Sequence, residues 1–133
     1  MSENLDLVRS LYAAWERGDY SASEWAQPDI EWVIADGPDP GTWVGLSGMA
    51  EGFRSSMGVF RDVQAEVEQY RELDAERVLV LELRQARGKA SGLELRRMRS
   101  EGAVLFYVRD GRVARLVFYW DRDRALADLG LKE

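Results

Sequence analysis

The 133-residue sequence contains no cysteine and no histidine. Without cysteine there is no disulfide, no thiolate metal site and no thiol nucleophile. Without histidine the usual general base near neutral pH and the commonest metal ligand are both missing. Any acid–base chemistry must therefore use Asp, Glu, Tyr, Lys or Arg. The sequence also lacks a glycine-rich phosphate loop, and we expect it to bind no metal and no cofactor.

Basic residues and long apolar runs are also scarce. Eighteen Lys and Arg against 24 Asp and Glu give a net charge of −6, which argues against a broad nucleic-acid-binding surface. No apolar run has membrane-spanning length, and the first residues have the pattern of an amphipathic helix rather than that of a signal peptide. We therefore expect one soluble, cytoplasmic domain over residues 1–133, with neither nucleic acid nor membrane as a partner.

The strongest pattern is a pair of apolar runs around Asp110-Gly111. An Asp-Gly pair between such runs predicts a β-hairpin with a two-residue turn, which sets Val108 opposite Val113 and Leu105 opposite Leu116. Because side chains alternate along a strand, two apolar faces are predicted. One face carries Ala103, Leu105, Tyr107, Leu116, Phe118 and Trp120, and the other carries Val104, Phe106, Val108, Val113, Val117 and Tyr119. Two apolar faces need two covers, which we expect to be helices on one side and a second subunit on the other.

The rest of the chain alternates between helical and strand patterns. Helices are predicted over 4–17, over 21–25 from a capping box, from Ser47 onward, and from an Asp121 cap to Gly130. Strands are predicted over 30–35, 63–73, 77–86, 93–108 and 112–120, with a bulge near Ser100 and Gly102. The order is helix, helix, strand, helix, four strands, helix. This order predicts an α+β fold in which a curved, mostly antiparallel sheet wraps around helices.

Three segments carry a family resemblance: LVRSLYAAWERGD, WAQPDIEW and FYVRDGRVARLVFYWDRDRALADLGL. Together with the element order they resemble the SnoaL-like group of the nuclear transport factor 2-like superfamily over essentially the whole chain. The resemblance implies a cone with an internal pocket and a dimer formed through the sheet. Members include isomerases, cyclases, epoxide hydrolases and binding proteins, so the fold alone does not select a function.

The resemblance also implies where two known activities would place their catalytic groups. Ketosteroid isomerases use a tyrosine, a carboxylate base and a protonated aspartate, and limonene-type epoxide hydrolases use two acids. In this sequence the corresponding positions are apolar: Leu11, Ile34 and Ala103 for the first activity, and Leu79 and Phe118 for the second. The resemblance therefore favours neither reaction.

A pocket for a small, flat, apolar molecule is predicted on one face of the sheet. Its wall would be Leu79, Leu81, Leu83, Gln85, Leu105, Tyr107, Leu116, Phe118 and Trp120, and its roof Tyr12, Trp15, Trp32 and Phe53. Trp43 follows a loop rich in proline and glycine, where it would either close the pocket mouth or anchor the loop. For all of these residues the alternative is ordinary core packing.

Asp36 is the leading candidate for a catalytic acid or base, because it follows the strand over 30–35 with the parity of Trp32. Tyr12 or Tyr107 would be the partner donor. The alternative for Asp36 is a turn role with the glycine and proline that follow it. Arg99 and Glu101 would form a charged pair, either at the pocket or at a solvated strand end.

Two functions therefore stay open from the sequence. One is a binding module for an apolar ligand, without turnover. The other is a small acid–base enzyme of isomerase, cyclase or dehydratase type. We also predict a homodimer, because five residues of the second face would leave an exposed apolar patch on a monomer. These are Val104, Phe106, Val113, Val117 and Tyr119.

Overall fold

A computed structural model describes residues 3–16, 24–36, 40–58, 60–88 and 97–131, and within them it leaves out the side chains of residues 16, 53–65 and 84–100. In chain order the elements are α1 (Glu3–Glu16), β1 (Ala26–Ile34), β2 (Gly41–Val44), α2 (Gly45–Gly58), β3 (Phe60–Glu72), β4 (Arg77–Gly88), β5 (Arg97–Arg109), β6 (Arg112–Tyr119) and α3 (Arg122–Leu129). This arrangement confirms the predicted α+β class.

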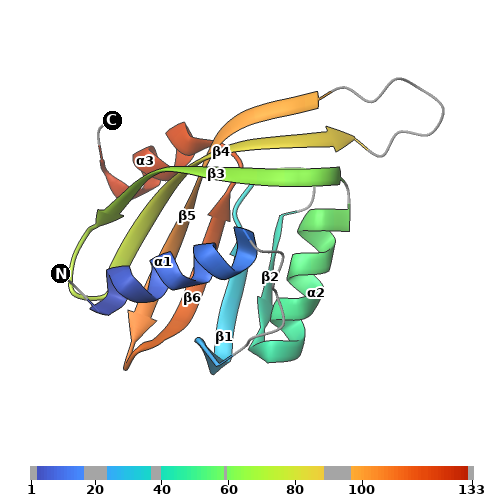
Figure 1. Cartoon of the computed structure of the whole chain (residues 1–133). Helices are drawn as coiled ribbons and strands as arrows, with labels where there is room; N and C mark the ends of the chain where they lie inside the picture. The colour runs from blue at the N-terminus through green and yellow to red at the C-terminus, as the bar shows by residue number, and fades with distance from the viewer. Residues whose placement is uncertain (1–2, 17–23, 37–39, 59, 89–96, 132–133) are drawn as a thin grey trace.

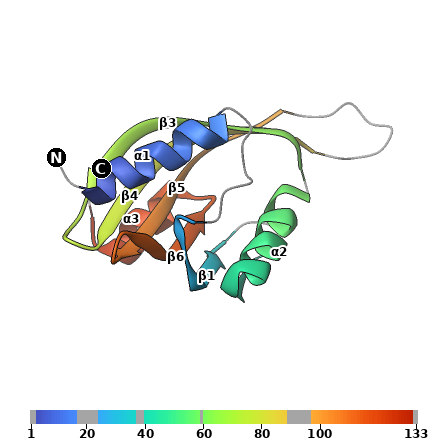
Figure 2. The same ribbon diagram turned by 60° about the horizontal axis from the view of Figure 1, so that its bottom comes forward.

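The strands form one curved, mixed sheet with the order β2-β1-β6-β5-β4-β3. β1 and β6 pair in parallel, and every other neighbouring pair is antiparallel. Figure 1 shows α1 lying across the near side of the strands and α3 behind β3 and β4, and Figure 2 shows the same two sides from a second direction. We call the face that contacts α1 the inner face and the face that contacts α3 the outer face.

The inner face and α1 share the larger core. α1 is amphipathic, with Val8, Leu11 and Tyr12 buried and Arg9 exposed, as expected for a helix that packs through one stripe. The sheet contributes side chains that alternate with those of the outer face: Ile30, Trp32, Ile34, Val78, Val80, Val104, Phe106, Val108, Val113, Leu116 and Phe118. Phe106 is the largest fully buried side chain among the described residues.

The hairpin turn between β5 and β6 confirms the prediction from Asp110-Gly111. Both residues have positive φ, 53° and 75°, which a type I′ turn requires. Val108 pairs with Val113 as predicted, but Tyr107 pairs with Arg115, so Ala114 is an extra residue in β6. A bulge of this kind shifts the register by one residue and reverses the face of every side chain beyond it.

The bulge corrects the predicted faces of the sheet. Leu105 opposes Val117, and Phe106 opposes Leu116. Leu116 and Phe118 therefore share the inner face with Val104 and Phe106, whereas the prediction had grouped them with Leu105 and Tyr107. Four residues of the predicted pocket wall lie in the outer cluster or pack against it, on the face opposite the predicted roof residue Tyr12: Leu79, Leu81, Leu105 and Tyr107.

The outer face is covered by α3 of the same chain. Asp121 accepts a hydrogen bond from the Asp123 N–H at the start of this helix, and Gly130 ends it with φ 67°, which confirms both predicted caps. Ala125 and Leu126 pack in the same buried cluster as the outer side chains of the sheet. The predicted exposed patch is therefore wrong: Val104, Phe106 and Val113 belong to the inner core, and Val117 and Tyr119 are buried in the outer cluster. Homodimer formation stays a prediction.

Three local predictions also need correction. Of the predicted helix over 21–25, residues 21–23 lie outside the described residues, and Glu24 and Trp25 form a turn. β1 begins at Ala26 and contains Pro28, whose missing N–H is tolerated because the pairing with β6 is irregular between Ala26 and Glu31. The β4–β5 pairing runs without a register shift past Ser100, so the bulge predicted there is wrong.

No helix in the described ranges is long and apolar enough to cross a membrane.

Candidate functional site

A buried carboxylate and a buried phenol meet on the inner face. Glu82 lies in β4 with the parity of Val78 and Val80, and it is 3% exposed. The Tyr12 hydroxyl of α1 donates a hydrogen bond to Glu82 Oε1 at 2.8 Å. Burial strengthens such a bond, because little water competes for either group. The pair joins the first helix to the middle of the sheet.

Aromatic rings pack against the Tyr12 member of the pair. The Tyr12 ring makes edge-to-face contacts with Trp15 at 5.1 Å, Tyr70 at 6.0 Å and Phe106 at 6.1 Å between centroids. Trp15 in turn stacks on Phe106 at 6.5 Å. The phenol that contacts the carboxylate therefore lies among flat apolar surfaces. Apolar walls with a few convergent polar groups are typical of small-molecule sites.

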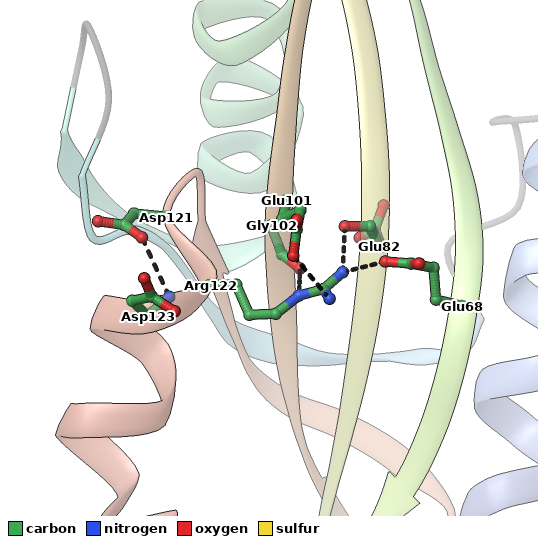
Figure 3. Close-up of polar contacts among 7 residues, drawn as sticks. All are labelled: Glu68, Glu82, Glu101, Gly102, Asp121, Arg122 and Asp123. Carbon is green, nitrogen blue, oxygen red and sulfur yellow. Dashed lines mark hydrogen bonds and ion pairs between the residues drawn. The ribbon is translucent and has the colours of Figure 1, made fainter. Parts of the chain in front are cut away.

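A buried arginine lies on the other side of the same strands. Among the residues whose side chains are described, Glu82 and Arg122 are the buried charged ones. The Arg122 guanidinium donates to the carbonyl oxygens of Glu82 at 2.8 Å and Gly102 at 3.4 Å. It also forms ion pairs with Glu101, at 3.2 Å, and with Glu68. Figure 3 shows this guanidinium reaching from the start of α3 across β5 and β4 to β3.

Asp36 takes part in a backbone contact rather than in the Tyr12–Glu82 pair. Its carboxylate accepts hydrogen bonds from the N–H groups of Trp120 at 2.6 Å and Asp121 at 3.2 Å. These contacts tie the end of β1 to the segment between β6 and α3. The turn residues 37–39 of the alternative interpretation lie outside the described residues. Asp36 thus has a positioning contact that neither sequence interpretation had considered.

Trp43 anchors α2 on the sheet. It pairs with Trp32 across β1 and β2, and it packs half-buried against the inner core. Gly52 of α2 lies so close that an added Cβ would be 2.5 Å from Trp32 Cδ1 and 3.0 Å from Trp43 Cδ2. This packing agrees with the anchoring alternative for Trp43.

The predicted site residues divide between the two faces. The inner core contains or contacts Tyr12, Trp15, Trp32, Trp43, Leu116, Phe118 and Trp120, and Phe118 and Trp120 meet edge to face at 5.4 Å. Tyr107 and the leucines Leu81 and Leu105 belong to the outer face, so Tyr107 does not meet Tyr12. Leu83 is half-buried and pairs with Glu101. The side chains of Phe53, Gln85 and Arg99 lie outside the described residues.

The sequence interpretation missed both buried charged groups. Glu82 carried a usable signal, because it is an acid within the apolar run VLVLEL, and charged residues are rarely buried unless they are paired. Arg122 carried none, since a basic residue after a helix cap usually faces solvent. Its partner Glu101 had been considered only as a partner of Arg99, whose side chain lies outside the described residues. Among the described residues no group of three or more acids is arranged to hold a metal ion.

Comparison with known proteins agrees with this fold. Residues 8–116 match the model of the SnoaL-like domain. No curated protein matches the sequence.

Three solved structures illustrate the likeness. An NTF2-like protein of unknown function from Burkholderia pseudomallei is 21% identical, with a TM-score of 0.76 over 96% of this chain and 97% of that one. TerC, co-crystallized with polyporic acid, is 22% identical, with a TM-score of 0.72 over 96% and 98%. A Catenulispora acidiphila protein with a ketosteroid isomerase-like fold, in complex with trimethylamine, is 14% identical, with a TM-score of 0.66 over 95% and 93%.

At these identities the solved structures show a shared fold and nothing about activity. The family model, in contrast, spans most of the sequence, including Tyr12 in α1 and Glu82 in β4. The protein therefore belongs to the SnoaL-like domain family and has the nuclear transport factor 2-like fold.

Proposed function

We propose that this protein binds a small, largely apolar ring compound on the inner face of its sheet, and that the Tyr12–Glu82 pair contacts a hydroxyl or carbonyl group of that compound. The observation that carries the proposal is the 2.8 Å hydrogen bond between two buried polar groups among aromatic rings. The complex of TerC with polyporic acid supports a ring compound as ligand of this fold.

Burial makes the pair costly as a purely structural feature. Moving a carboxylate out of water is unfavourable, and polar contacts inside a protein replace only part of its hydration. An apolar side chain at position 82 would continue the core formed by Val78 and Val80. A polar pair kept in such a place is a typical sign of a functional site, where local packing rules are broken for another purpose.

Acid–base catalysis at the same pair is the second candidate. A carboxylate beside a phenol is the arrangement needed to remove a proton next to a carbonyl group. Glu82 would take the proton from carbon while the electron pair moves to the carbonyl oxygen. The Tyr12 hydroxyl would stabilise that oxygen with a hydrogen bond. Return of the proton to a different carbon would complete an isomerisation without a cofactor.

Ligand binding can be measured through the tryptophans. Trp15 contacts Tyr12, so its fluorescence should report a ligand that reaches the pair. The titration panel contains steroids, polyketides, terpenoids and polyporic acid. Glu82→Gln and Tyr12→Phe should each weaken the best ligand by about tenfold, the usual worth of one buried polar contact. Tyr119→Phe is the matched control, because this equally buried tyrosine lies on the outer face.

The panel also tests the proposal against its alternatives. Equal affinity of wild type, Glu82→Gln and Tyr12→Phe for every ligand would refute the role of the pair. For each ligand that binds, incubation in D2O followed by NMR tests the second candidate. Deuterium should enter next to the carbonyl with wild type and not with Glu82→Gln. Binding without deuterium exchange would refute the acid–base candidate and leave ligand binding alone.

Assembly and location belong to the same proposal. A homodimer stays a prediction, although the residues of the patch that suggested it are buried in the inner core and in the outer cluster. Sedimentation at micromolar concentration would test it, and a monomer would refute it. The cytoplasmic location likewise stays a prediction, which fractionation of cells producing the protein would test.

A further inference from the structure

We propose that Arg122 is a positioning residue that sets Glu82 against Tyr12 from the opposite face of the sheet. The inference rests on the proposed function of the Tyr12–Glu82 pair. Arg122 contacts the backbone of Glu82, whereas Tyr12 contacts its side chain. The same residue is therefore held from both faces, by α1 on the inner side and by α3 on the outer side.

The guanidinium contacts three adjacent strands at one level. Its Nη2 donates to the Glu82 carbonyl oxygen at 2.8 Å in β4, and its Nε donates to the Gly102 carbonyl oxygen at 3.4 Å in β5. Gly102 is the β5 residue that pairs with Glu82. On the other side Nη2 also reaches Glu68 of β3. Figure 3 shows these contacts fanning out from one side chain.

The partner from β3 occupies an irregular position. Val67 pairs with Glu82 and Gln69 pairs with Leu81, so Glu68 is an extra residue between them. Bulges next to functional sites commonly redirect a side chain. Here the bulge lies beside Glu82 in the pairing, and the Glu68 carboxylate contacts Arg122. The bulge at Glu68 and the side chain of Arg122 thus both lie beside Glu82 of β4.

The start of α3 is itself fixed. Asp121 caps the helix, and Asp36 accepts hydrogen bonds from the N–H groups of Trp120 and Asp121. The backbone that carries Arg122 is therefore tied to the end of β1. A continuous set of contacts runs from Asp36 through the start of α3 to the Glu82 backbone. This gives Asp36 an indirect part in the site, and its catalytic role stays a prediction.

Only an arginine provides this geometry. A guanidinium is planar and has five N–H donors in a rigid fork, so it can serve two carbonyl oxygens and two carboxylates at once. A lysine keeps the charge but offers one compact ammonium group. Arg122→Lys therefore separates positioning from charge. Arg124→Lys is the matched control, since Arg124 lies two residues along the same helix with a half-exposed side chain near Asp128.

The first measurement needs no ligand. Tyrosine labelled with ¹³C at Cζ gives one NMR signal for each of the five tyrosines, and the signal lost in Tyr12→Phe identifies Tyr12. Its shift reports the hydrogen bond to Glu82, so Glu82→Gln should move it. We expect Arg122→Lys to move the Tyr12 signal in the same direction and Arg124→Lys to leave it unchanged. An unchanged signal in Arg122→Lys would overturn the proposal and leave a stabilising role alone.

The second measurement uses the best ligand of the fluorescence panel. Residues in one network are coupled, so Arg122→Lys should weaken binding roughly tenfold in wild type. In the Glu82→Gln background the same change should have no effect, because the group being positioned is gone. An equal loss in both backgrounds would overturn the proposal.

Two outcomes separate this proposal from the proposed function. If no compound binds to wild type, the proposed function fails, and the Tyr12 signal still decides whether Arg122 positions Glu82. If Arg122→Lys does not fold, the double variant Glu68→Gln/Glu101→Gln replaces it, because it loosens the guanidinium without removing it. A Tyr12 signal that is unmoved in this folded variant would overturn the proposal.

Discussion

Replacing Tyr12 by phenylalanine tests the energetic importance of the buried pair. The change removes one hydroxyl and leaves the ring in its contacts with Trp15, Tyr70 and Phe106. Its main effect is therefore to delete the 2.8 Å hydrogen bond to Glu82. The acceptor that remains is 3% exposed, so water cannot easily take the place of the phenol.

The expected cost follows from that geometry. Hydrogen bonds to charged groups contribute about 1.5–3 kcal/mol. We expect Tyr12→Phe to lower the free energy of unfolding by about 2 kcal/mol. For a chain of this size the loss corresponds to a fall in Tm of roughly 7 °C.

Urea unfolding followed by tryptophan fluorescence measures this cost. Tyr119→Phe is the control, because Tyr119 is also buried but its hydroxyl meets the half-exposed Asp128 at 3.3 Å. That weaker bond should contribute about 0.5 kcal/mol. In a Glu82→Leu background the cost of Tyr12→Phe should fall to about zero. The hydrogen bond between the two side chains is already absent in that background, so the second change has no bond left to remove.

Two results would refute the reasoning. The first is an equal cost for Tyr12→Phe and Tyr119→Phe, which would mean that the buried pair contributes no more than an ordinary partly solvated bond. The second is a cost for Tyr12→Phe that is unchanged by Glu82→Leu, which would assign the effect to ring packing.

Three further predictions concern contacts outside the Tyr12–Glu82 pair. Gly52→Ala should lower the free energy of unfolding, measured in urea, by about 1–2 kcal/mol, because the added Cβ would overlap Trp32. Alanine has the better helix propensity, so a more stable variant would contradict the close approach of Gly52 to Trp32. Asp36→Ala should speed hydrogen exchange at the Trp120 amide, measured by NMR, since that N–H loses its acceptor; unchanged protection would contradict the tether. The backbone N–H of Glu76 and the Arg77 side chain hold the pKa of Asp74 below its ordinary value of 3.8. These contacts with the Asp74 carboxylate stabilise the folded state above about pH 3.8, and this stabilisation is lost as pH falls through the folded pKa. Asp74→Asn should therefore be less stable than wild type at neutral pH. The urea midpoints of the two proteins should converge in acid.

Much of the fold was predictable because its signals are local. The type I′ hairpin needs two residues that tolerate positive φ, and Asp110-Gly111 supplies them wherever the rest of the chain lies. The α3 caps are likewise short-range, since Asp121 bonds to an N–H two residues away and the C-terminal cap needs only the left-handed conformation of one glycine, Gly130. The family resemblance worked for the same reason, because it was based on contiguous segments that the family model also covers.

The sequence determined that these strands have two apolar sides, and the tertiary structure decided which side is which. With Val, Leu and Phe on both faces, a shift of one residue leaves the pattern equally apolar. The extra residue Ala114 therefore left no mark in the alternation of β5 and β6. The pairing of Tyr12 with Glu82, and the reach of Arg122 to the same strand, depend on residues 70 and 40 positions apart. Such contacts exist only after the sheet has curved between two helices, so no local pattern could have predicted them.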